Sequence, residues 1–403
     1  MRQWSLLIPV FYKLDLLSPA MELIAKTLHG LEGVLQEELK ELGAQNIQVL
    51  KRAVRFEGDK ELLYRANLEL RTALRVLLPI HQFKARNEEQ LYRAVGRINW
   101  SKYLDLDQTF AIDSVVHSPF FRHSKYAALK TKDAIVDQFR RLHGQRPSVN
   151  VLDPNLRIHL LILDQECQIM FDSSDQPLFK RGYRARTVEA PINEVLAAGI
   201  LKMAGWPRNC HFLDPMCGSG TFVVEAALMA HSIVPQRKRK GFGFQLWNNY
   251  DEKLWQSIWE PASQRITSFD YRIVGSDKAI PAFKASQFNV EEAGLEGKVE
   301  LFRKKFDRLP PIEAPCLLVF NPPYDVRLSD GGEGGILAFY KSIGDTLKKH
   351  YQDCEAWMIS SNKDAIKKIG LRTTSKRQLF NGSLECRLLQ YELYEGSRKN
   401  KEE

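Results

Sequence analysis

The sequence predicts an α/β protein that begins with a ferredoxin-like unit, continues into a second α+β unit and ends in a doubly wound, mainly parallel sheet. Three observations predict this class. The chain has 403 residues, enough for two or three domains. Apolar runs follow a β-α-β-β-α-β order up to about residue 81. Beyond residue 190, short apolar runs alternate with helical segments.

The first unit has the pattern of a small sheet covered by two helices. Its first helix places leucines on one stripe and charged residues on the opposite stripe, as expected for a helix that packs on a sheet. We therefore expect a ferredoxin-like domain over residues 21–80. We interpret residues 1–20 as an extension or a mis-assigned start, because Lys13 and Asp15 interrupt the apolar run that a secretory signal needs. The expected strands are 24–29, 47–51, 53–57 and 75–81, and the expected helices are 31–42 and 60–73.

The second unit, over residues 81–175, is unusually basic. We expect its helices at 88–98 and 126–141 and its strands at 109–116, 157–163 and 168–172. Basic and aromatic side chains are interleaved here, a mixture that can neutralise phosphates and stack on unpaired bases. A solvated helix face is the alternative. The linker at 176–190 is also basic, and the predicted RNA-binding residues in the two segments are Lys125, Lys130, Lys132, Arg181 and Arg184.

Charge and cysteine usage narrow the class of protein. Lys and Arg number 58 against 49 Asp and Glu, a formal charge of +9 that favours a polyanionic partner. The six cysteines are scattered without C-x-x-C pairs or nearby histidines, so we expect a reduced, cytoplasmic protein and no metal. No apolar run approaches the ~20 residues of a membrane span.

The third region, residues 191–396, predicts the parallel sheet. Strands expected at 211–214, 272–275, 299–302, 316–320 and 356–360 alternate with helices, and ligands of such sheets bind at the carboxyl ends of the strands. Asn381-Gly382 between two β-rich runs predicts a terminal antiparallel hairpin. The charged tail at 397–403 follows.

A strand, a glycine turn and a helix form the first chemical motif, Asp214-Pro-Met-Cys-Gly-Ser-Gly-Thr221. Gly218 and Gly220 remove Cβ atoms where a ligand must approach the backbone, and the helix N-terminus offers free N–H groups to an anion. Val223 stands at the third glycine of a dinucleotide fingerprint, and no phosphate-loop lysine follows. The motif predicts a nucleotide-like ligand with a negative end.

Asp277 follows the next strand, at the position where a carboxylate holds ribose hydroxyls in such folds. The separation of 63 positions between Asp214 and Asp277 requires an insertion at about 231–270 to be looped out. The insertion contains Trp255 and Trp259 at i, i+4 spacing, which we interpret as packing of a helical flap.

Asn321-Pro-Pro-Tyr324 is the second chemical motif. Two prolines fix φ and remove N–H donors, which makes the turn rigid. The Asn321 carboxamide and the backbone carbonyls then form an acceptor pair suited to the NH₂ of a purine or cytosine. Accepting both hydrogens encourages that poorly nucleophilic nitrogen toward tetrahedral geometry, and Tyr324 can stack on the base.

Together the two motifs resemble those of S-adenosylmethionine-dependent amino methyltransferases. Lys-Arg-Gly-Tyr-Arg at 180–184, Ala-Pro-Ile-Asn-Glu at 190–194 and the basic segment 130–134 are similar to the RlmL-like, THUMP-domain subgroup that methylates guanine N2 in 23S ribosomal RNA. The resemblance covers residues 21–394 and implies a THUMP domain at 81–175 and a Rossmann-like class I methyltransferase domain at 191–396. Some members continue into a second methyltransferase domain, which we do not expect in this chain. The resemblance therefore does not imply a second modification by the same polypeptide.

The resemblance also implies a role for each site residue. Asn321, Pro322 and Tyr324 would form the reaction centre. Asp277 would hold the ribose of S-adenosylmethionine, Asp307 would lie near its adenine, and Pro191 and Asn193 would close its methionine end. The rest of the cofactor site would be Asp214, Pro215, Cys217, Gly218, Ser219, Gly220 and Thr221.

The leading hypothesis is methyl transfer to N2 of a guanine in 23S ribosomal RNA or a large-subunit assembly intermediate. An N6-adenine methyltransferase acting on DNA or RNA is the alternative, since Asn-Pro-Pro-Tyr serves adenine amines equally well. A non-catalytic RNA-binding assembly factor is a second alternative, against which the intact motifs argue. The sequence predicts no oligomeric state.

Overall fold

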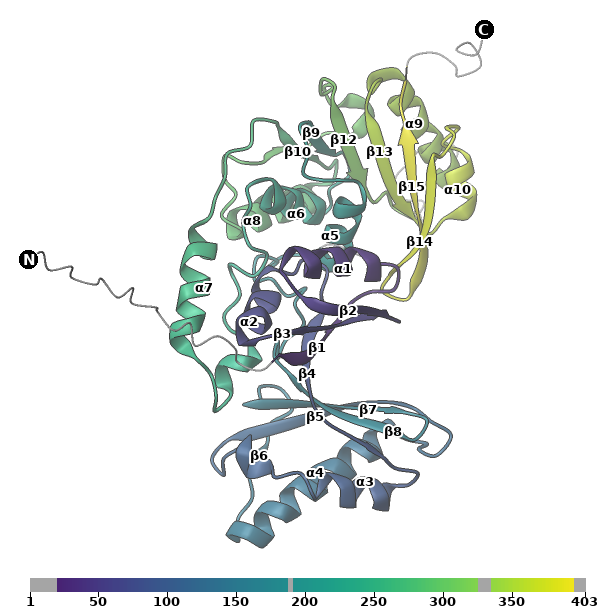
Figure 1. Cartoon of the computed structure of the whole chain (residues 1–403). Coiled ribbons are helices and arrows are strands. Elements are labelled where there is room, and N and C mark those ends of the chain that lie inside the picture. The colour runs from purple at the N-terminus through teal and green to yellow at the C-terminus, as the bar shows by residue number, and fades with distance from the viewer. Residues whose placement is uncertain (1–19, 188–190, 325–334, 395–403) are drawn as a thin grey trace, which may run out of the picture.

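The computed structural model describes residues 20–187, 191–324 and 335–394, and two sheets organise them (Figure 1). The first sheet has the strand order β2-β3-β1-β4-β8-β7-β5-β6, and the second has the order β11-β10-β9-β12-β13-β15-β14. The predicted α/β class is confirmed. The expected extension, apart from residue 20, and the charged tail lie outside the described residues.

The first unit contains all six elements expected from its pattern, and the central strand β1 pairs antiparallel with β3 and β4. Leu35 and Leu39 of the first helix and Leu63 of the second pack in one buried cluster on this sheet. The Asp59 side chain caps the second helix by accepting from Leu62 N at 2.8 Å. The elements are β1 (Met21–Lys26), α1 (Glu32–Glu41), β2 (Gln45–Leu50), β3 (Ala53–Gly58), α2 (Lys60–Glu69) and β4 (Arg75–Lys84).

The long strand β4 joins the first unit to the second. Its residues 75–77 pair with β1, and its residues 77–84 pair with β8. One sheet therefore runs through both units. The second unit packs its helices α3 and α4 on one face of this sheet. Its elements are α3 (Glu88–Val95), η1 (Trp100–Lys102), β5 (Thr109–His117), α4 (Ser124–His143), β6 (Ser148–Val149), β7 (Leu156–Leu163) and β8 (Glu166–Asp172).

A buried carboxylate ends β8. Asp172 is fully buried, pairs with Arg75, and lies 3.1 Å from His159 Nε2. Burial alone raises the pKa of Asp172, but the hydrogen bond to His159 and the charges of His159 and Arg75 outweigh it and hold the pKa below its ordinary value. Because the folded-state pKa is depressed, this stabilisation is complete above pH ~4 and is lost as the pH falls through the folded-state pKa.

We expect Asp172→Asn to lower the free energy of unfolding by about 3 kcal/mol at neutral pH, because it leaves the largely buried Arg75 guanidinium without its counter-charge. Urea denaturation measures this change, and the exposed Asp153→Asn is the matched control. The gap between wild type and Asp172→Asn should narrow as the pH falls below ~4. A gap that stays constant with pH would contradict the assigned ion pair.

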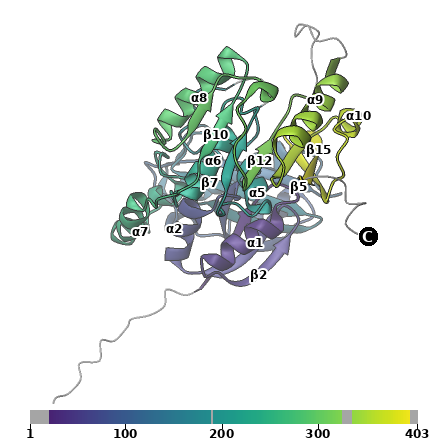
Figure 2. The same cartoon turned by 90° about the horizontal axis from the view of Figure 1, so that it is seen from above.

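The second sheet has five parallel strands followed by an antiparallel hairpin, as the sequence predicts. Helices cover both faces (Figure 2), with α5, α6 and α8 contributing to one core cluster and α9 and α10 to the other. The helices are α5 (Glu194–Met203), α6 (Thr221–Ala230), α8 (Ile280–Glu292), α9 (Gly335–His350) and α10 (Lys363–Lys367). The strands are β9 (His211–Asp214), β10 (Ile273–Ser276), β11 (Glu300–Phe302), β12 (Cys316–Phe320), β13 (Glu355–Ser360), β14 (Ser375–Asn381) and β15 (Leu384–Glu392), with η3 at Phe306–Arg308.

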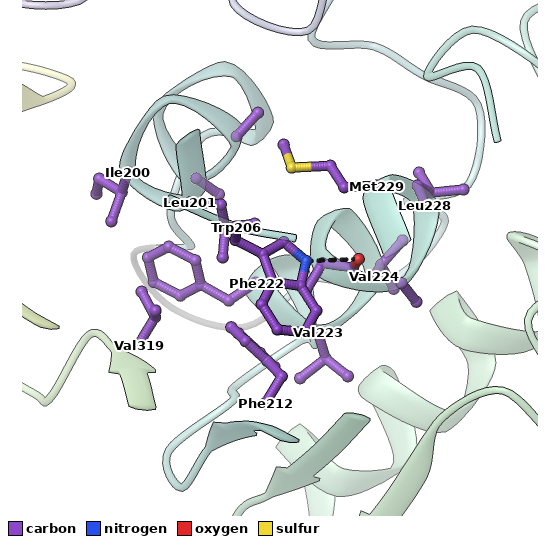
Figure 3. Packing of buried hydrophobic residues seen from close by; sticks show 14 of the residues in the cluster. Ile200, Leu201, Trp206, Phe212, Phe222, Val223, Val224, Leu228, Met229 and Val319 are labelled. Carbon is purple, nitrogen blue, oxygen red and sulfur yellow. Dashed lines mark hydrogen bonds between the residues drawn. The ribbon is translucent and has the colours of Figure 1, made fainter. Parts of the chain in front are cut away.

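Trp206 lies at the centre of the first of these clusters (Figure 3). Its ring is 5.1 Å from that of Phe212, centroid to centroid, and its Nε1 donates to Ala226 O at 2.9 Å. The buried tryptophan thus has both an apolar contact and a partner for its N–H. It joins β9 to α6, the two elements on either side of the glycine turn.

The insertion at 231–270 packs back on the first unit. It contains η2 (Gly243–Leu246) and α7 (Glu252–Gln264), and α7 lies beside α2 (Figure 1). Phe244 stacks on Tyr64 at 4.2 Å, and Trp255 is buried in the same cluster. The predicted packing role of Trp255 is confirmed. The insertion, which belongs to the same region of the chain as the parallel sheet, packs on the ferredoxin-like unit. Within the described ranges, no helix is long and apolar enough to cross a membrane.

Candidate functional site

Three predicted site residues lie at one edge of the second sheet. Asp214 ends β9, Asn321 directly follows β12, and Asp277 directly follows β10. Strand β9 lies between β10 and β12, and all three run parallel. Their carboxyl ends therefore bring the glycine turn and the Asn-Pro-Pro-Tyr turn together, as expected for a doubly wound sheet.

The glycine turn needs its glycines. Gly218 and Gly220 have φ of 55° and 85°, in the left-handed region that other residues rarely adopt. A Cβ at Gly220 would lie 3.1 Å from the Cβ of Ser286 on α8. Gly218 N donates to Asp277 Oδ2 at 3.0 Å, which joins the turn to the next strand. Gly220 directly precedes α6, so the turn ends at the first N–H groups of that helix.

Burial changes the ionisation of the groups behind this turn. Asp214 is 1% exposed, and its Oδ1 accepts from Met216 N at 3.1 Å. Burial raises its pKa well above the ordinary value, and the charge of Asp277 adds to the shift. Burial also raises the pKa of the Cys217 thiol. Cys217 is thus held as a neutral thiol, which is unsuited to nucleophilic catalysis.

The Asn-Pro-Pro-Tyr turn carries an unpaired acceptor. Asn321 Oδ1 is buried, and no group within the described ranges donates a hydrogen bond to it. A buried carbonyl without a donor is costly, so the native structure retains few of them without a reason. Asn321 Oδ1 is therefore an acceptor that the described residues leave available.

Two side chains hold this turn from behind. Tyr340 OH donates to Pro323 O at 3.2 Å, and Asn362 Nδ2 donates to Tyr324 O at 2.9 Å. Ser360 Oγ is a partner of Tyr340 OH at 2.7 Å and accepts from Asn362 N. Our sequence analysis missed all three residues. Ser360 and Asn362 could have been found, because they stand at the carboxyl end of a predicted strand.

Tyr324 lies between this turn and the terminal hairpin. Its ring is partly buried against the core cluster on the α5 and α6 side of the sheet, and its hydroxyl accepts a weak hydrogen bond from Cys386 Sγ at 3.6 Å. Burial raises the pKa of the phenol above its ordinary value. Tyr324 is therefore a neutral ring held in place at the carboxyl edge of the second sheet.

The other predicted cofactor residues surround the same edge. Asn193 caps α5 by accepting from Val195 N at 2.9 Å, and Pro191 stands two residues before it. Asp307 is exposed on η3, which follows β11. Their contacts with a cofactor remain predictions.

Two of the linker arginines, Arg181 and Arg184, face the protein interior. Arg181 is 1% exposed, its Nε lies 2.7 Å from Glu225 Oε1, and its Nη2 donates to Arg71 O at 2.7 Å. This burial corrects the predicted RNA contact of Arg181, because a guanidinium enclosed with its counter-charge cannot reach a phosphate. Arg184 is also turned inward, onto Glu194.

The predicted lysines lie on α4, below the first sheet and away from the second in Figure 1. Lys125 is exposed, Lys130 Nζ lies 5.7 Å from the centroid of the Tyr126 ring, and Lys132 pairs with Asp133 at 2.6 Å. Their RNA contacts remain predictions.

No metal centre is found in the described ranges, where no three His, Cys, Asp or Glu residues are grouped suitably. A cavity of about 560 Å³ lies at the opposite, amino edge of the second sheet, away from both motifs. Its lining includes Arg208, Cys316, Cys354 and Glu355.

Comparison with domain families divides the chain into three matched segments. Residues 22–77 match the RlmL ferredoxin-like domain, residues 85–172 match the THUMP domain, and residues 181–390 match the RMKL-like methyltransferase domain. The resemblance drawn from the sequence motifs is confirmed by these matches.

Individual relatives agree. A Synechocystis protein named "Putative RNA methyltransferase slr0064" is 39% identical over 372 residues, which span 92% of this chain and 96% of that protein. The "Ribosomal RNA large subunit methyltransferase K/L" of Syntrophotalea carbinolica is 37% identical over 91% of this chain, and the chain spans 53% of that enzyme's length. A crystal structure of SMU.472, "a putative methyltransferase complexed with SAH", covers 94% of this chain and 100% of its own at 30% identity, with a TM-score of 0.81.

Proposed function

This chain belongs to the RMKL-like methyltransferase family, and from that premise we propose that it methylates the N2 amine of a guanine in 23S ribosomal RNA with S-adenosylmethionine as donor. The curated K/L enzymes that it matches are about twice as long, so their substrate is a proposal for this chain. We place the reaction in the cytoplasm, where bacteria such as those of the relatives assemble their ribosomes.

The residues at the carboxyl edge fit the cofactor. Bound S-adenosylmethionine supplies an electrophilic methyl group on a sulfonium. The close approach of Gly220 to Ser286 leaves no room for a side chain in the turn, and the N–H groups at the start of α6 favour the carboxylate of a methionine end. Asp277 is suited to ribose hydroxyls, since each carboxylate oxygen can accept more than one hydrogen bond.

The observation that carries the proposed reaction is the buried Oδ1 of Asn321, which accepts no hydrogen bond from the residues that the structure describes. An exocyclic purine amine is conjugated with its ring and is a poor nucleophile. An acceptor from Asn321 and one from the Pro322 carbonyl would engage its two hydrogens and favour a tetrahedral nitrogen in the transition state. Tyr324 would support the face of the flipped base.

The RNA would be captured by the ferredoxin-like and THUMP units. The names of the relatives support RNA as the substrate, and α4 offers lysines interleaved with the exposed ring of Tyr126. Helix α4 packs on the first sheet, whereas the two motifs lie at the carboxyl edge of the second sheet. A bound RNA that contacts both would have to extend along the molecule (Figure 1).

Replacing Lys125, Lys130 and Lys132 together by alanine should weaken RNA binding and flatten its salt dependence. Each lost phosphate contact should change the log-log slope of affinity against salt by about 0.7–0.9. The control removes three exposed lysines of α9, by alanine at Lys341, Lys348 and Lys349, so that net charge falls equally. If the salt dependence of RNA affinity has the same slope in the two triple variants, the lysines of α4 do not contact phosphates and form only a solvated helix face.

Mass spectrometry of ribosomal nucleosides from cells with and without the gene tests the proposed base. Loss of N2-methylguanosine on deletion supports the proposal. Loss of N6-methyladenosine would instead support the adenine alternative, which the same acceptors can serve. No change in either nucleoside would favour a binding-only assembly factor.

A further inference from the structure

The segment 181–187 lies beside the glycine turn at 214–221. Within it, Arg184 is half-buried, and its guanidinium contacts three oxygen atoms, two by hydrogen bonds and one by an ion pair. Its Nη2 donates to Thr221 Oγ1 at 2.7 Å and to Ile192 O at 2.8 Å. Its Nε lies 2.9 Å from Glu194 Oε1.

These acceptors belong to two walls of the proposed cofactor site. Thr221 is the first residue of α6, directly after Gly220. Ile192 and Glu194 flank Asn193, the N-cap of α5. A guanidinium presents its donors in one plane and in fixed directions, so a single side chain sets the spacing between the two walls.

The ion pair contributes position more than net charge. Arg184 and Glu194 have side chains only 15% and 4% exposed, and their charges cancel. Burial raises the pKa of Glu194, and the charge of Arg184 acts in the opposite direction. Removing Arg184 would leave a buried carboxyl and an unpaired threonine hydroxyl beside the turn.

Asn289 of α8 fixes the backbone of the same segment and is 1% exposed. Its Nδ2 donates to Ser219 O and to Arg186 O, both at 2.9 Å, and its Oδ1 accepts from the backbone N–H groups of Ala185 and Arg186 at 3.2 Å. The backbone that directly follows Arg184 is thereby tied to the glycine turn.

We propose that Arg184 is a positioning residue for methyl transfer, which holds the glycine turn against residues 191–194 so that the methionine end of S-adenosylmethionine meets a preformed site. Arg184 acts through Thr221 and Glu194 and contacts neither cofactor nor RNA. The inference rests on the proposed function for the identity of the cofactor, and it replaces the RNA contact predicted for Arg184 from the sequence.

Calorimetric titration of the full chain with S-adenosylmethionine tests this role. Arg184→Ala should weaken binding by at least about tenfold, the loss expected for hydrogen bonds to a charged group. The affinity of Arg184→Lys for S-adenosylmethionine should lie between those of wild type and Arg184→Ala, because an ammonium keeps the charge but lacks the planar arrangement of donors. Thr221→Val should weaken binding in the same direction. Arg186→Ala is the control, since that side chain lies over the Phe288 ring and exposes its charge.

Steady-state kinetics separate positioning from RNA contact. In Arg184→Ala the KM for S-adenosylmethionine should rise, while the KM for RNA and the rate at saturating cofactor change little. The effects of Arg184→Ala and Thr221→Val should be less than multiplicative when combined, because both remove the same hydrogen bond. Thermal unfolding establishes that each variant is folded.

Wild-type affinity for S-adenosylmethionine in folded Arg184→Ala would overturn the inference. If that variant fails to fold, unchanged affinity in both Arg184→Lys and Thr221→Val would overturn it. A rise confined to the KM for RNA would restore the RNA contact. A wild-type protein that binds S-adenosylmethionine but methylates no guanine would contradict the proposed function and leave the role of Arg184 standing.

Discussion

Asn321→Ala should slow methyl transfer about 10²- to 10³-fold while leaving RNA and cofactor binding nearly unchanged. The lost carbonyl is an acceptor that is useful chiefly as the target nitrogen becomes tetrahedral, so its removal acts on turnover more than on affinity. The magnitude follows oxyanion-hole donors, which are also single positioned hydrogen-bonding groups. Single-turnover assays at saturating S-adenosylmethionine measure the chemical step directly.

Two further variants complete this test. Asn321→Asp keeps an acceptor oxygen and should retain more of the rate than Asn321→Ala. Asn209→Ala removes an exposed amide near the opposite, amino edge of the same sheet and should leave the rate unchanged. If Asn321→Ala transfers methyl groups at the wild-type rate, the turn at the end of β12 is not the reaction centre.

Gly220→Val should abolish S-adenosylmethionine binding while RNA binding persists. The glycine has a φ of 85°, and an added Cβ would meet Ser286 Cβ at 3.1 Å and Ser286 Cα at 3.4 Å. Valine adds two further carbons at this contact, and its branched Cβ is poorly suited to the left-handed region. The turn must shift, and the N–H groups of α6 shift with it. Calorimetry with S-adenosylmethionine and a separate RNA-binding assay measure the two affinities.

Gly297→Val is the matched control for this change. Gly297 has a φ of 74°, but nothing lies within 4 Å of a Cβ built there. The control therefore carries the same kind of backbone strain without the close contact, and it should lose stability but keep cofactor binding. Equal cofactor affinity in Gly220→Val and wild type would remove the glycine turn from the cofactor site.

The two motifs could be predicted from the sequence because each is local. The glycine turn and Asn-Pro-Pro-Tyr follow apolar strands directly, and the parallel topology brings the ends of such strands to one edge. Strands β9 and β12 occupy the predicted residues, whereas the predicted helix at 60–73 ends at Glu69. The Asn381-Gly382 pair likewise predicts the hairpin of β14 and β15, although Asn381 ends β14 and the two connecting residues are Gly382 and Ser383.

The linker could not be read in the same way. Arg181 and Arg184 stand in a basic run that resembles an RNA-binding segment. Their counter-charges are Glu225, inside the mostly apolar helix α6, and Glu194, the first residue of α5. Asn289 gives no local signal either, because a polar residue inside a helix more often faces solvent. Only the packing of α5, α6 and α8 on one face of the sheet brings these partners together.

The central claim is that the carboxyl edge of the second sheet methylates guanine N2 in ribosomal RNA. Its most direct test incubates the purified chain and deproteinised 23S ribosomal RNA with methyl-labelled S-adenosylmethionine, followed by separation of the nucleosides. We predict label in N2-methylguanosine with wild type and almost none with Asn321→Ala. Label in N6-methyladenosine, or in no nucleoside although the wild-type chain binds the cofactor, would contradict the account.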